Sequence, residues 1–204
     1  MTEEQKPRGY FTNVLAFDSE TSGVALGMLD PTHDPSTGET FQMVSVGLIV
    51  ADVATLQPID ELYIEIKWNG ESAWKESAEK IHGLSKSYLA VNGLTEEEAV
   101  AEIGTFLLKH FGPANCIHLL GHNVATFDRY FLAQLFAKYG IDLQFGNRHI
   151  DTYSLGVVLL GAYNSDDLFA SLGLGVRDTH NALEDTRLTL AAARRLQKLF
   201  GTLF

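Results

Sequence analysis

Features of membrane-spanning, secreted and fibrous proteins are missing from this sequence. The 204 residues include a single cysteine, Cys116, so no disulfide can form within the chain, which agrees with a reducing compartment. No uninterrupted run of about 18 apolar residues exists, and the polar N-terminal segment lacks the apolar centre of a signal peptide. With no repeats and 46% hydrophobic residues, the composition is that of an ordinary globular protein. We therefore expect a cytoplasmic protein that does not contact a membrane.

Positive charge is also scarce. Lysine and arginine number 15 against 26 aspartate and glutamate residues, which gives a net charge of -11. Nucleic-acid-binding domains usually carry a basic surface, so this balance argues against that class of function. The objection stays open, because carboxylates that hold metal ions would distort the count. Any basic groove would have to be local, and its candidates, which are otherwise ordinary surface charges, are Arg129, Arg148, Arg177 and Arg187.

The order of apolar and polar segments predicts an α/β fold, a mixed sheet covered by helices. Thr95 and Glu98 form a capping box that should start the first long helix. Residues 1–10 should form a loose tail and residues 11–204 one domain. In chain order we expect strands at 13–20, 42–52 and 62–68 in an antiparallel sheet, a long loop at 23–40 between the first two, a helix after residue 95, a strand at 116–120, a helix at 125–139, a short strand at 149–152, short helices over 153–175 and a last helix at 181–200.

The first predicted strand ends in two carboxylates. Asp18 and Glu20 are two residues apart, and side chains two apart in a strand share one face of the sheet. Ser19, which lies between them, should point to the other side. In open α/β sheets the carboxyl ends of the strands tend to bind ligands, so both carboxylates lie where a site is expected.

Two predicted helices each direct a carboxylate toward the core near their first turn. Asp128 belongs to the same helical stripe as Leu132, Leu135 and Tyr139. A carboxylate on an apolar stripe is costly unless it is paired or bound to a metal. Asp185 repeats this pattern in the last helix, where its stripe contains Ala182, Leu188, Ala192, Leu196 and Leu199.

These four carboxylates have no evident basic partners and would repel one another. Hard divalent cations such as Mg²⁺ or Mn²⁺ resolve the repulsion, because they prefer carboxylate oxygen and water. Two ions about 3.5–4 Å apart could hold the attacking and leaving oxygens of a phosphodiester displacement. His180 stands just before the last helix and could act as general base, because the ordinary pKa of histidine is about 6.5. Its alternative interpretation is a helix cap or a surface residue.

Three segments, FDSETSG, GHNVATFD and HNALED, together resemble the motifs of the DEDDh 3′→5′ exonucleases. This superfamily includes the proofreading epsilon subunit of bacterial DNA polymerase, RNase T and oligoribonuclease. The resemblance runs from about Asn13 to Ala193. It implies a ribonuclease-H-like fold with a five-stranded mixed sheet, two Mg²⁺ or Mn²⁺ ions, and stepwise release of nucleoside monophosphates from a 3′ end.

The resemblance also implies a role for each residue of the acidic set. Asp18 would bridge both ions, and Glu20 and Asp185 would help to hold the ion that activates water. Asp128 would support the second ion. His180 would be the general base, and a histidine at this position, rather than a tyrosine, places the chain in the h branch.

Further residues beside these motifs are expected at the substrate. The segment AEKIHGLS is similar to an Ile-His-Gly segment of the family that contacts the terminal sugar and base. Each of three candidates has an alternative interpretation. His82 could be a loop histidine that has no role, and Asn123 could cap the local backbone. Phe127 could be a core residue, as is expected for Phe17 and Phe131. The complete set of substrate-binding candidates is Ser19, Thr21, Ser22, Ile81, His82, Gly83, Asn123 and Phe127.

The loop over residues 23–40 follows the first motif directly and is longer than in compact members of the family. We expect it to form a lid or part of the strand groove, with Leu26, Met28 and Leu29 offering apolar surface. Val24 or Leu26 could wedge against the terminal bases, since stacking surfaces favour single strands. A loop with no role is the alternative.

The sequence thus predicts a two-metal 3′→5′ exonuclease that acts on the 3′ end of single-stranded nucleic acid, DNA rather than RNA. An oligoribonuclease, an accessory proofreading subunit that mainly binds a polymerase, and an inactive nucleic-acid-binding fold are the alternatives. A polymerase partner lacks support from a tail like that of the epsilon subunit, because the sequence ends soon after the last helix. The apolar C-terminal residues could form a homodimer or pack on their own core, and they are Leu199, Phe200, Leu203 and Phe204.

Overall fold

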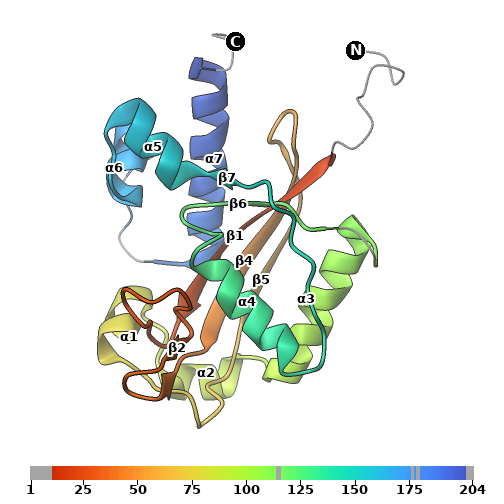
Figure 1. Ribbon diagram of the computed structural model, residues 1–204, viewed down its shortest axis with the longest axis vertical. Coiled ribbons are helices and arrows are strands. Elements are labelled where there is room, and N and C mark those ends of the chain that lie inside the picture. Colours follow the sequence, from red (N-terminus) through yellow and green to blue (C-terminus); the bar gives the residue numbers. More distant parts are fainter. Residues whose placement is uncertain (1–10, 114–115, 176, 178–179, 201–204) are drawn as a thin grey trace.

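A computed structural model describes residues 11–113, 116–175, 177 and 180–200 of the protein. The tail expected at residues 1–10 lies outside this range, as do Leu203 and Phe204. At the centre is a five-stranded sheet in the order β5-β4-β1-β6-β7, with helices on both faces (Figure 1). The mixed α/β architecture predicted from the sequence is therefore confirmed.

Antiparallel pairing builds one half of the sheet and parallel pairing the other. The central strand β1 pairs antiparallel with β4, and β4 pairs antiparallel with β5. On its other side β1 runs parallel to β6, which runs parallel to β7. A small hairpin of β2 and β3 lies inside the expected loop. The strand bounds are β1 (Asn13–Thr21), β2 (His33–Asp34), β3 (Glu39–Thr40), β4 (Met43–Asp52), β5 (Pro58–Glu65), β6 (Leu119–Gly121) and β7 (Ile150–Asp151).

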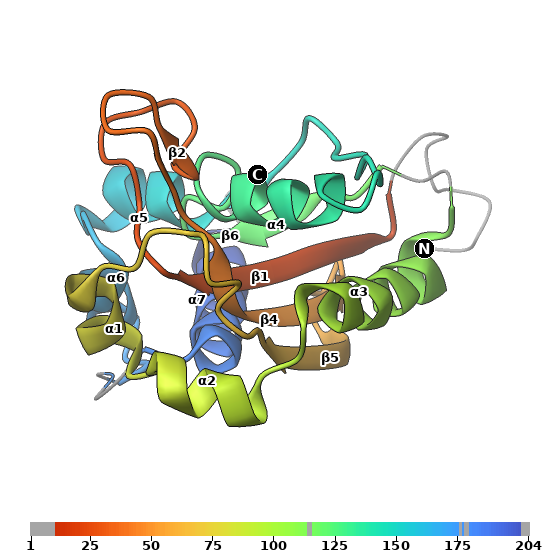
Figure 2. The same cartoon turned by 90° about the horizontal axis from the view of Figure 1, so that it is seen from below.

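Helices α3 and α4 cover one face of the sheet, and α7 packs on the other (Figure 2). The predicted capping box is present at the start of α3, where Thr95 and Glu98 bond each other's backbone N–H. In the described part of the chain, no helix is both long and apolar enough to span a membrane. The helix bounds are α1 (Glu76–His82), α2 (Lys86–Asn92), α3 (Glu96–Phe111), α4 (Asp128–Ala137), α5 (Thr152–Leu160), α6 (Ser165–Ser171) and α7 (Ala182–Phe200).

Strand β1 is buried on both faces, and its alternation decides where the acidic residues point. Leu15 and Phe17 belong to the core shared with α3 and α4. Val14 and Ala16 belong to the core shared with α7. Because side chains two apart share a face, Asp18 and Glu20 continue the row that faces α7. Both carboxylates therefore lie at the end of the central strand, on the face of the sheet where α7 begins.

Predicted boundaries of β5, β6 and α4 were wrong by three or more residues. Strand β5 begins at Pro58 instead of residue 62 because its polar first half pairs along the sheet edge with β4. Helix α4 begins three residues later than predicted, since a turn closed by the carbonyl of Asn123 precedes it. Tyr139 lies beyond the end of α4 and is 41% exposed, so it does not belong to the buried stripe of Asp128. Leu199 was likewise misplaced on a buried stripe and is 57% exposed.

Candidate active site

Two elements that are distant in the sequence meet at the carboxyl end of β1. Strand β1 supplies Glu20, which is 8% exposed, and the first turn of α7 supplies Asp185, which is 3% exposed. His180 lies just before α7, with its Nδ1 3.2 Å from Oδ2 of Asp185. One potential ligand atom from each of these three residues lies within 4.8 Å of the other two. The fold thus brings together the first and third predicted motifs.

Asp128 reaches the same end of β1 from the opposite face of the sheet. It is the first residue of α4 and is 3% exposed. Its Oδ1 accepts hydrogen bonds from the backbone N–H of Ser19 (2.9 Å) and from the Ser19 hydroxyl (2.7 Å). Ser19 was expected to point away from the carboxylates of its own strand, but in doing so it holds the carboxylate of α4.

A groove of about 520 Å³ opens beside these carboxylates. Asp18 and Asp128 lie at its wall together with Asn123 and Phe127, which were predicted at the substrate. Phe127 also packs against the main core, so both interpretations of this residue describe its position. The loop after β1 supplies the remaining apolar wall with Val24, Ala25, Leu26, Gly27, Met28 and Pro31.

Two aromatic residues of the groove were not predicted. His122 and Tyr153 both line it, and their rings meet edge to face at 5.6 Å between centroids. His122 directly precedes Asn123 in the second motif, so its place within that motif could have indicated that it lies at the site. Tyr153 lies in the first turn of α5 and gives no signal of its own in the sequence.

Asn123 has a backbone role at this site. Its φ is 66°, in the left-handed region that asparagine tolerates better than most residues. Its N–H donates to Oδ1 of Asp151 (3.0 Å), and its carbonyl accepts from the N–H groups of Thr126 and Phe127. The turn that it forms places Asp128 at the first position of α4.

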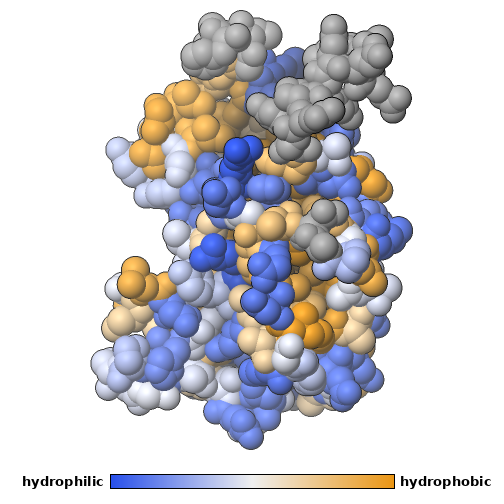
Figure 3. Space-filling model, turned by 45° about the vertical axis from the view of Figure 1, so that its right-hand side comes forward, coloured by the Kyte–Doolittle hydropathy of each residue, from blue (hydrophilic) through white to orange (hydrophobic). Residues whose placement is uncertain are grey.

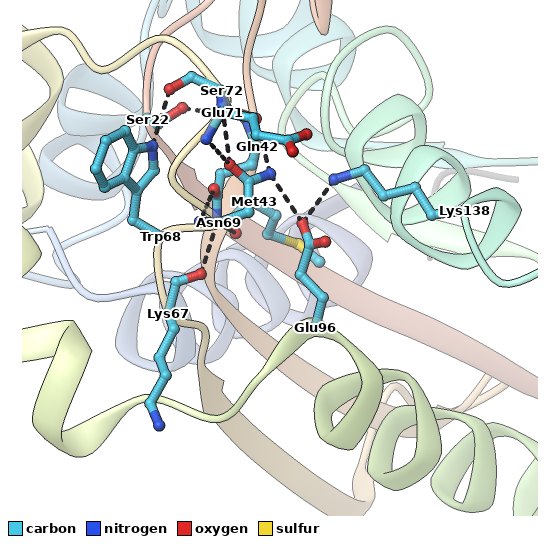
Figure 4. A network of polar contacts seen from close by, with 10 residues as sticks. All are labelled: Ser22, Gln42, Met43, Lys67, Trp68, Asn69, Glu71, Ser72, Glu96 and Lys138. Carbon is cyan, nitrogen blue, oxygen red and sulfur yellow. Dashed lines mark hydrogen bonds and ion pairs between the residues drawn. The ribbon is translucent and has the colours of Figure 1, made fainter.

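The end of β1 is held by a network of polar side chains (Figure 4). Ser22 is fully buried, and its hydroxyl accepts from the backbone N–H of Gln42 (3.0 Å). Gln42 is also buried, and its amide bonds the backbone at Asn69 and Lys67. Thr21, 8% exposed, precedes Ser22 at the same strand end. The network therefore connects the first motif to the chain segment after β5.

The Ile-His-Gly segment does not line the groove. It forms the end of α1, where Gly83 adopts the left-handed conformation of a helix C-cap. Ile81 is 54% exposed, whereas His82 is 6% exposed and meets Trp74 edge to face. Burial lowers the pKa of His82, although the charge of Glu79 and the backbone of Thr21 act against this. His82 therefore lies beside the end of β1, and none of the three residues lines the groove.

Helix α7 is seated directly on β4. Gly47 is the residue opposite Asp18 in the sheet. A Cβ atom added to Gly47 would lie 2.3 Å from Cα of Leu183. The hydroxyl of Thr186 donates to the carbonyl of Gly47 (2.9 Å). Asn181 accepts bonds from the first N–H groups of α7, which caps the helix. The positions of His180 and Asp185 therefore depend on this contact.

Burial raises the pKa of three of these carboxyl groups, and acidic neighbours add to the rise for Asp18 and Glu20. Burial raises the pKa of Glu20 to about 7, and the charges of Asp185 and Asp128 add to this. Burial also raises the pKa of Asp128 to about 7, although its bonds with Ser19 oppose the shift. Loss of hydration raises the pKa of Asp18 well above its ordinary value, and its acidic neighbours raise it further.

The expectation that these carboxylates lack a basic partner was wrong. Arg177 places its Nη1 2.9 Å from Oδ2 of Asp185. Its charge lowers the pKa of both Asp18 and Glu20, against the larger effect of burial. Arg177 was also expected at the surface, yet its side chain is only 9% exposed. Arg187, another candidate for a basic groove, instead bonds Glu61 and Glu184.

The donor set fits hard divalent cations. Oε1 of Glu20 and Oδ1 of Asp185 are buried, and neither has a hydrogen-bond partner among the described residues. A buried carboxylate oxygen without a partner is costly, and a bound cation would remove that cost. Mg²⁺ and Mn²⁺ prefer oxygen donors of this kind.

Without bound metal, the protein is expected to lose stability as the pH rises from 5 to 8. A carboxyl group whose pKa is raised in the folded state contributes stability below its unfolded pKa and loses it as the pH passes the folded value. For Glu20 this window runs from 4.5 to about 7. We expect a loss on the order of 3 kcal/mol, since each pKa unit corresponds to about 1.4 kcal/mol.

Thermal unfolding at pH 5 and pH 8, in EDTA and in magnesium chloride, measures this effect. Magnesium should stabilise the protein more at pH 8, because bound ions require charged carboxylates. A metal-free protein that is more stable at pH 8 than at pH 5 would contradict the assigned pKa shifts.

The sequence matches an exonuclease family model. The RNase_T model, described as an exonuclease, matches residues 15–193. The PolC-type DNA polymerase III of Thermotoga petrophila is 29% identical over 177 residues, which make up 86% of this chain and 12% of that polymerase. The chain thus spans about one eighth of the polymerase that it matches.

Solved structures of exonuclease I have a similar fold. The enzyme from Methylocaldum szegediense has a TM-score of 0.71 and 21% identity, with 95% of this chain and 42% of that chain covered. The zinc-bound E. coli exonuclease I complex with single-stranded DNA has a TM-score of 0.73 and 19% identity, again with 95% and 42% covered. The expected ribonuclease-H-like fold is confirmed by this similarity.

Proposed function

Because the chain belongs to the exonuclease family, we propose that it hydrolyses phosphodiester bonds stepwise from the 3′ end of single-stranded nucleic acid, with DNA preferred. The observation that carries this proposal is the meeting of Glu20, His180 and Asp185 within 4.8 Å, beside a groove that Asp18 and Asp128 line. Each turnover would release a nucleoside monophosphate.

Four carboxylates are proposed to hold two divalent cations, magnesium or manganese: those of Asp18, Glu20, Asp128 and Asp185. Cations bound there would lower the pKa of a water molecule and neutralise charge on the leaving oxygen. His180 is the proposed general base. Its Nδ1 faces Asp185, so Nε2 is left to accept the proton of the attacking water. Its side chain is 38% exposed, so water can reach the ring.

The loop after β1 supports a preference for unpaired strands. Leu26 is 84% exposed and Leu29 93% exposed, while Met28 is 42% exposed. Exposed apolar side chains beside a groove are suited to stacking with unpaired bases. We propose that this loop contacts the last bases of the strand, and that Asn123 and Phe127 lie along the terminal nucleotide.

A 5′-labelled oligonucleotide assay tests the function. With magnesium or manganese, single-stranded DNA should be shortened in one-nucleotide steps from its 3′ end, faster than duplex DNA and faster than RNA of the same sequence. EDTA should abolish the reaction, because the carboxylates alone offer no electrophile. A 3′-phosphorothioate linkage should slow the first step. Endonucleolytic products, or digestion that persists in EDTA, would contradict the proposal.

Experiments can distinguish the proposed function from two of its alternatives. The similarity to PolC-type polymerases favours a second candidate, in which the domain removes nucleotides in association with a polymerase. Co-purification of the protein with a polymerase, and stimulation by it on mismatched primer ends, would distinguish this candidate. Faster digestion of short RNA than of DNA would instead point to the oligoribonuclease alternative.

A homodimer and a cytoplasmic location remain our predictions. Helix α5 offers an apolar surface for self-association, visible as an orange area at the upper left of Figure 3. Its exposed residues include Leu155, Val158 and Leu159, with exposed fractions of 37%, 80% and 38%. The single cysteine agrees with a reducing compartment.

A further inference from the structure

Arg177 is a buried cation beside the proposed metal site. Its side chain is 9% exposed, and that of its partner Asp185 is 4% exposed. The guanidinium Nη1 lies 2.9 Å from Oδ2 of Asp185. An arginine buried to this degree needs several partners, because each unpaired N–H would be costly.

The other side of the guanidinium is anchored by α6. Its Nε and Nη2 donate to Oδ1 of Asp166 at 3.0 and 2.7 Å, and Nη2 also donates to the hydroxyl of Ser165 at 2.7 Å. The ring of Phe169 lies 5.1 Å from the guanidinium carbon, at the distance of a cation–π contact. Three side chains from one helix therefore fix the orientation of Arg177.

The two oxygens of Asp185 have different surroundings. Oδ2 faces both Arg177 at 2.9 Å and Nδ1 of His180 at 3.2 Å. Oδ1 is buried and has no hydrogen-bond partner among the described residues, and the same is true of Oε1 of Glu20. One oxygen of the carboxylate is thus occupied by protein groups, and the other is left for a ligand.

We propose that Arg177 is a positioning residue for the metal ligand Asp185. By holding Oδ2, it turns Oδ1 toward the space shared with Glu20 and keeps the carboxylate from rotating. Helix α6 acts through Arg177, so Asp166 contributes to the same site from a second layer. This inference rests on the proposed function, because it requires that Asp185 binds a divalent cation.

A different role for Arg177, neutralising the charge of Asp185, predicts the opposite change in metal affinity when the arginine is removed. A positive charge so close to the carboxylates repels divalent cations, so an arginine that merely neutralised Asp185 would weaken metal binding. Its removal would then tighten binding. A positioning arginine does the reverse, since partners of metal ligands typically contribute 10–100-fold to metal affinity.

The test is calorimetric titration of the 204-residue protein with manganese chloride, after circular dichroism has confirmed folding of each variant. We expect Arg177→Gln to weaken manganese binding by about 10–100-fold. Arg177→Lys, which keeps the charge but loses the planar fork, should recover only part of the affinity. Asp166→Asn should weaken binding in the same direction but less, and it serves as the test if Arg177→Gln does not fold.

Arg187→Gln is the matched control. Like Arg177→Gln, it removes one positive charge, here from the first turns of α7. Arg187, however, bonds Glu61 and Glu184 instead of Asp185. Its manganese affinity should stay within about twofold of the wild type. Unchanged or tighter binding by Arg177→Gln would overturn the positioning role while leaving the exonuclease proposal intact. If the wild-type protein takes up no manganese, the metal-dependent function itself fails.

Discussion

Replacing Asp18 by asparagine is expected to lower the rate of nucleotide release by more than about 100-fold. Loss of a residue that only supports a metal ligand typically costs about 10–100-fold, and loss of a ligand itself should cost more. Asp18 ends the buried row of β1 that faces α7, and its pKa is raised by lost hydration and by the charges of Asp128, Glu20 and Asp185. Asparagine has nearly the same shape but cannot supply a negatively charged ligand. The change therefore removes metal-holding capacity with little effect on packing.

The same substitution should leave the metal-free protein at least as stable as the wild type. Removing one of several mutually repelling charges relieves an unfavourable interaction in the folded state. Initial rates on 5′-labelled single-stranded DNA and melting temperatures in EDTA measure the two effects. Glu102→Gln, which neutralises an exposed carboxylate of α3, is the control and should change neither. Wild-type digestion by Asp18→Asn would show that the acidic set is not the active site.

Replacing Gly47 by alanine is expected to give the largest loss of stability together with loss of activity. The added methyl group would lie 2.3–2.5 Å from backbone atoms of Ala182 and Leu183, which no side-chain rotation can relieve. Helix α7 would have to move away from β4 and break the bond from Thr186 to the carbonyl of Gly47. We expect a destabilisation of about 2–4 kcal/mol, at or above the usual cost of overpacking.

The activity loss should exceed what unfolding explains. A displacement of about 1 Å at a catalytic group can reduce a rate by about 100-fold, and α7 carries Asp185 with His180 just before it. Rates measured at 10 °C, where the variant is folded, separate the two effects. The control is Gly104→Ala in α3, whose new methyl group would come no closer than 3.7 Å to the Phe136 ring. It should be neutral or slightly stabilising, because alanine favours helix. Equal stabilities of the two variants would contradict the close seating of α7.

Local patterns in the sequence were enough to predict most elements of the fold. The apolar run of β1, the capping box of α3 and the amphipathic pattern of α7 each reflect interactions within a few residues. Prediction was poorer for β5, since its polar first half is stabilised by pairing with β4 rather than by its own composition. Helix α4 began later than its apolar pattern suggested, because the turn at Asn123 depends on Asp151, 28 residues away.

The acidic residues were recognisable for a similar reason. A carboxylate on an apolar stripe or at the end of a buried strand is costly, and that cost can be inferred from the immediate sequence. Asp128 and Asp185 are indeed buried, and Glu20 lies beside Asp185. Their proposed roles as metal ligands follow from the same argument, and the experiments above test them.

Sequence pattern alone specified the order of the main elements and the acidic residues, but not the β2–β3 hairpin, α1 or α2, because hydrophobic periodicity and the cost of burying charge act over short distances. It could not specify that Arg177 turns inward onto Asp185, that Tyr153 faces His122, or that Gly47 lies under α7. Those contacts join segments far apart in the chain, and their geometry follows from how the helices pack on the sheet. The tertiary fold therefore determined the surroundings of the carboxylates, which raise the pKa of Asp18, Glu20 and Asp128 and leave two oxygens without a hydrogen-bond partner among the described residues.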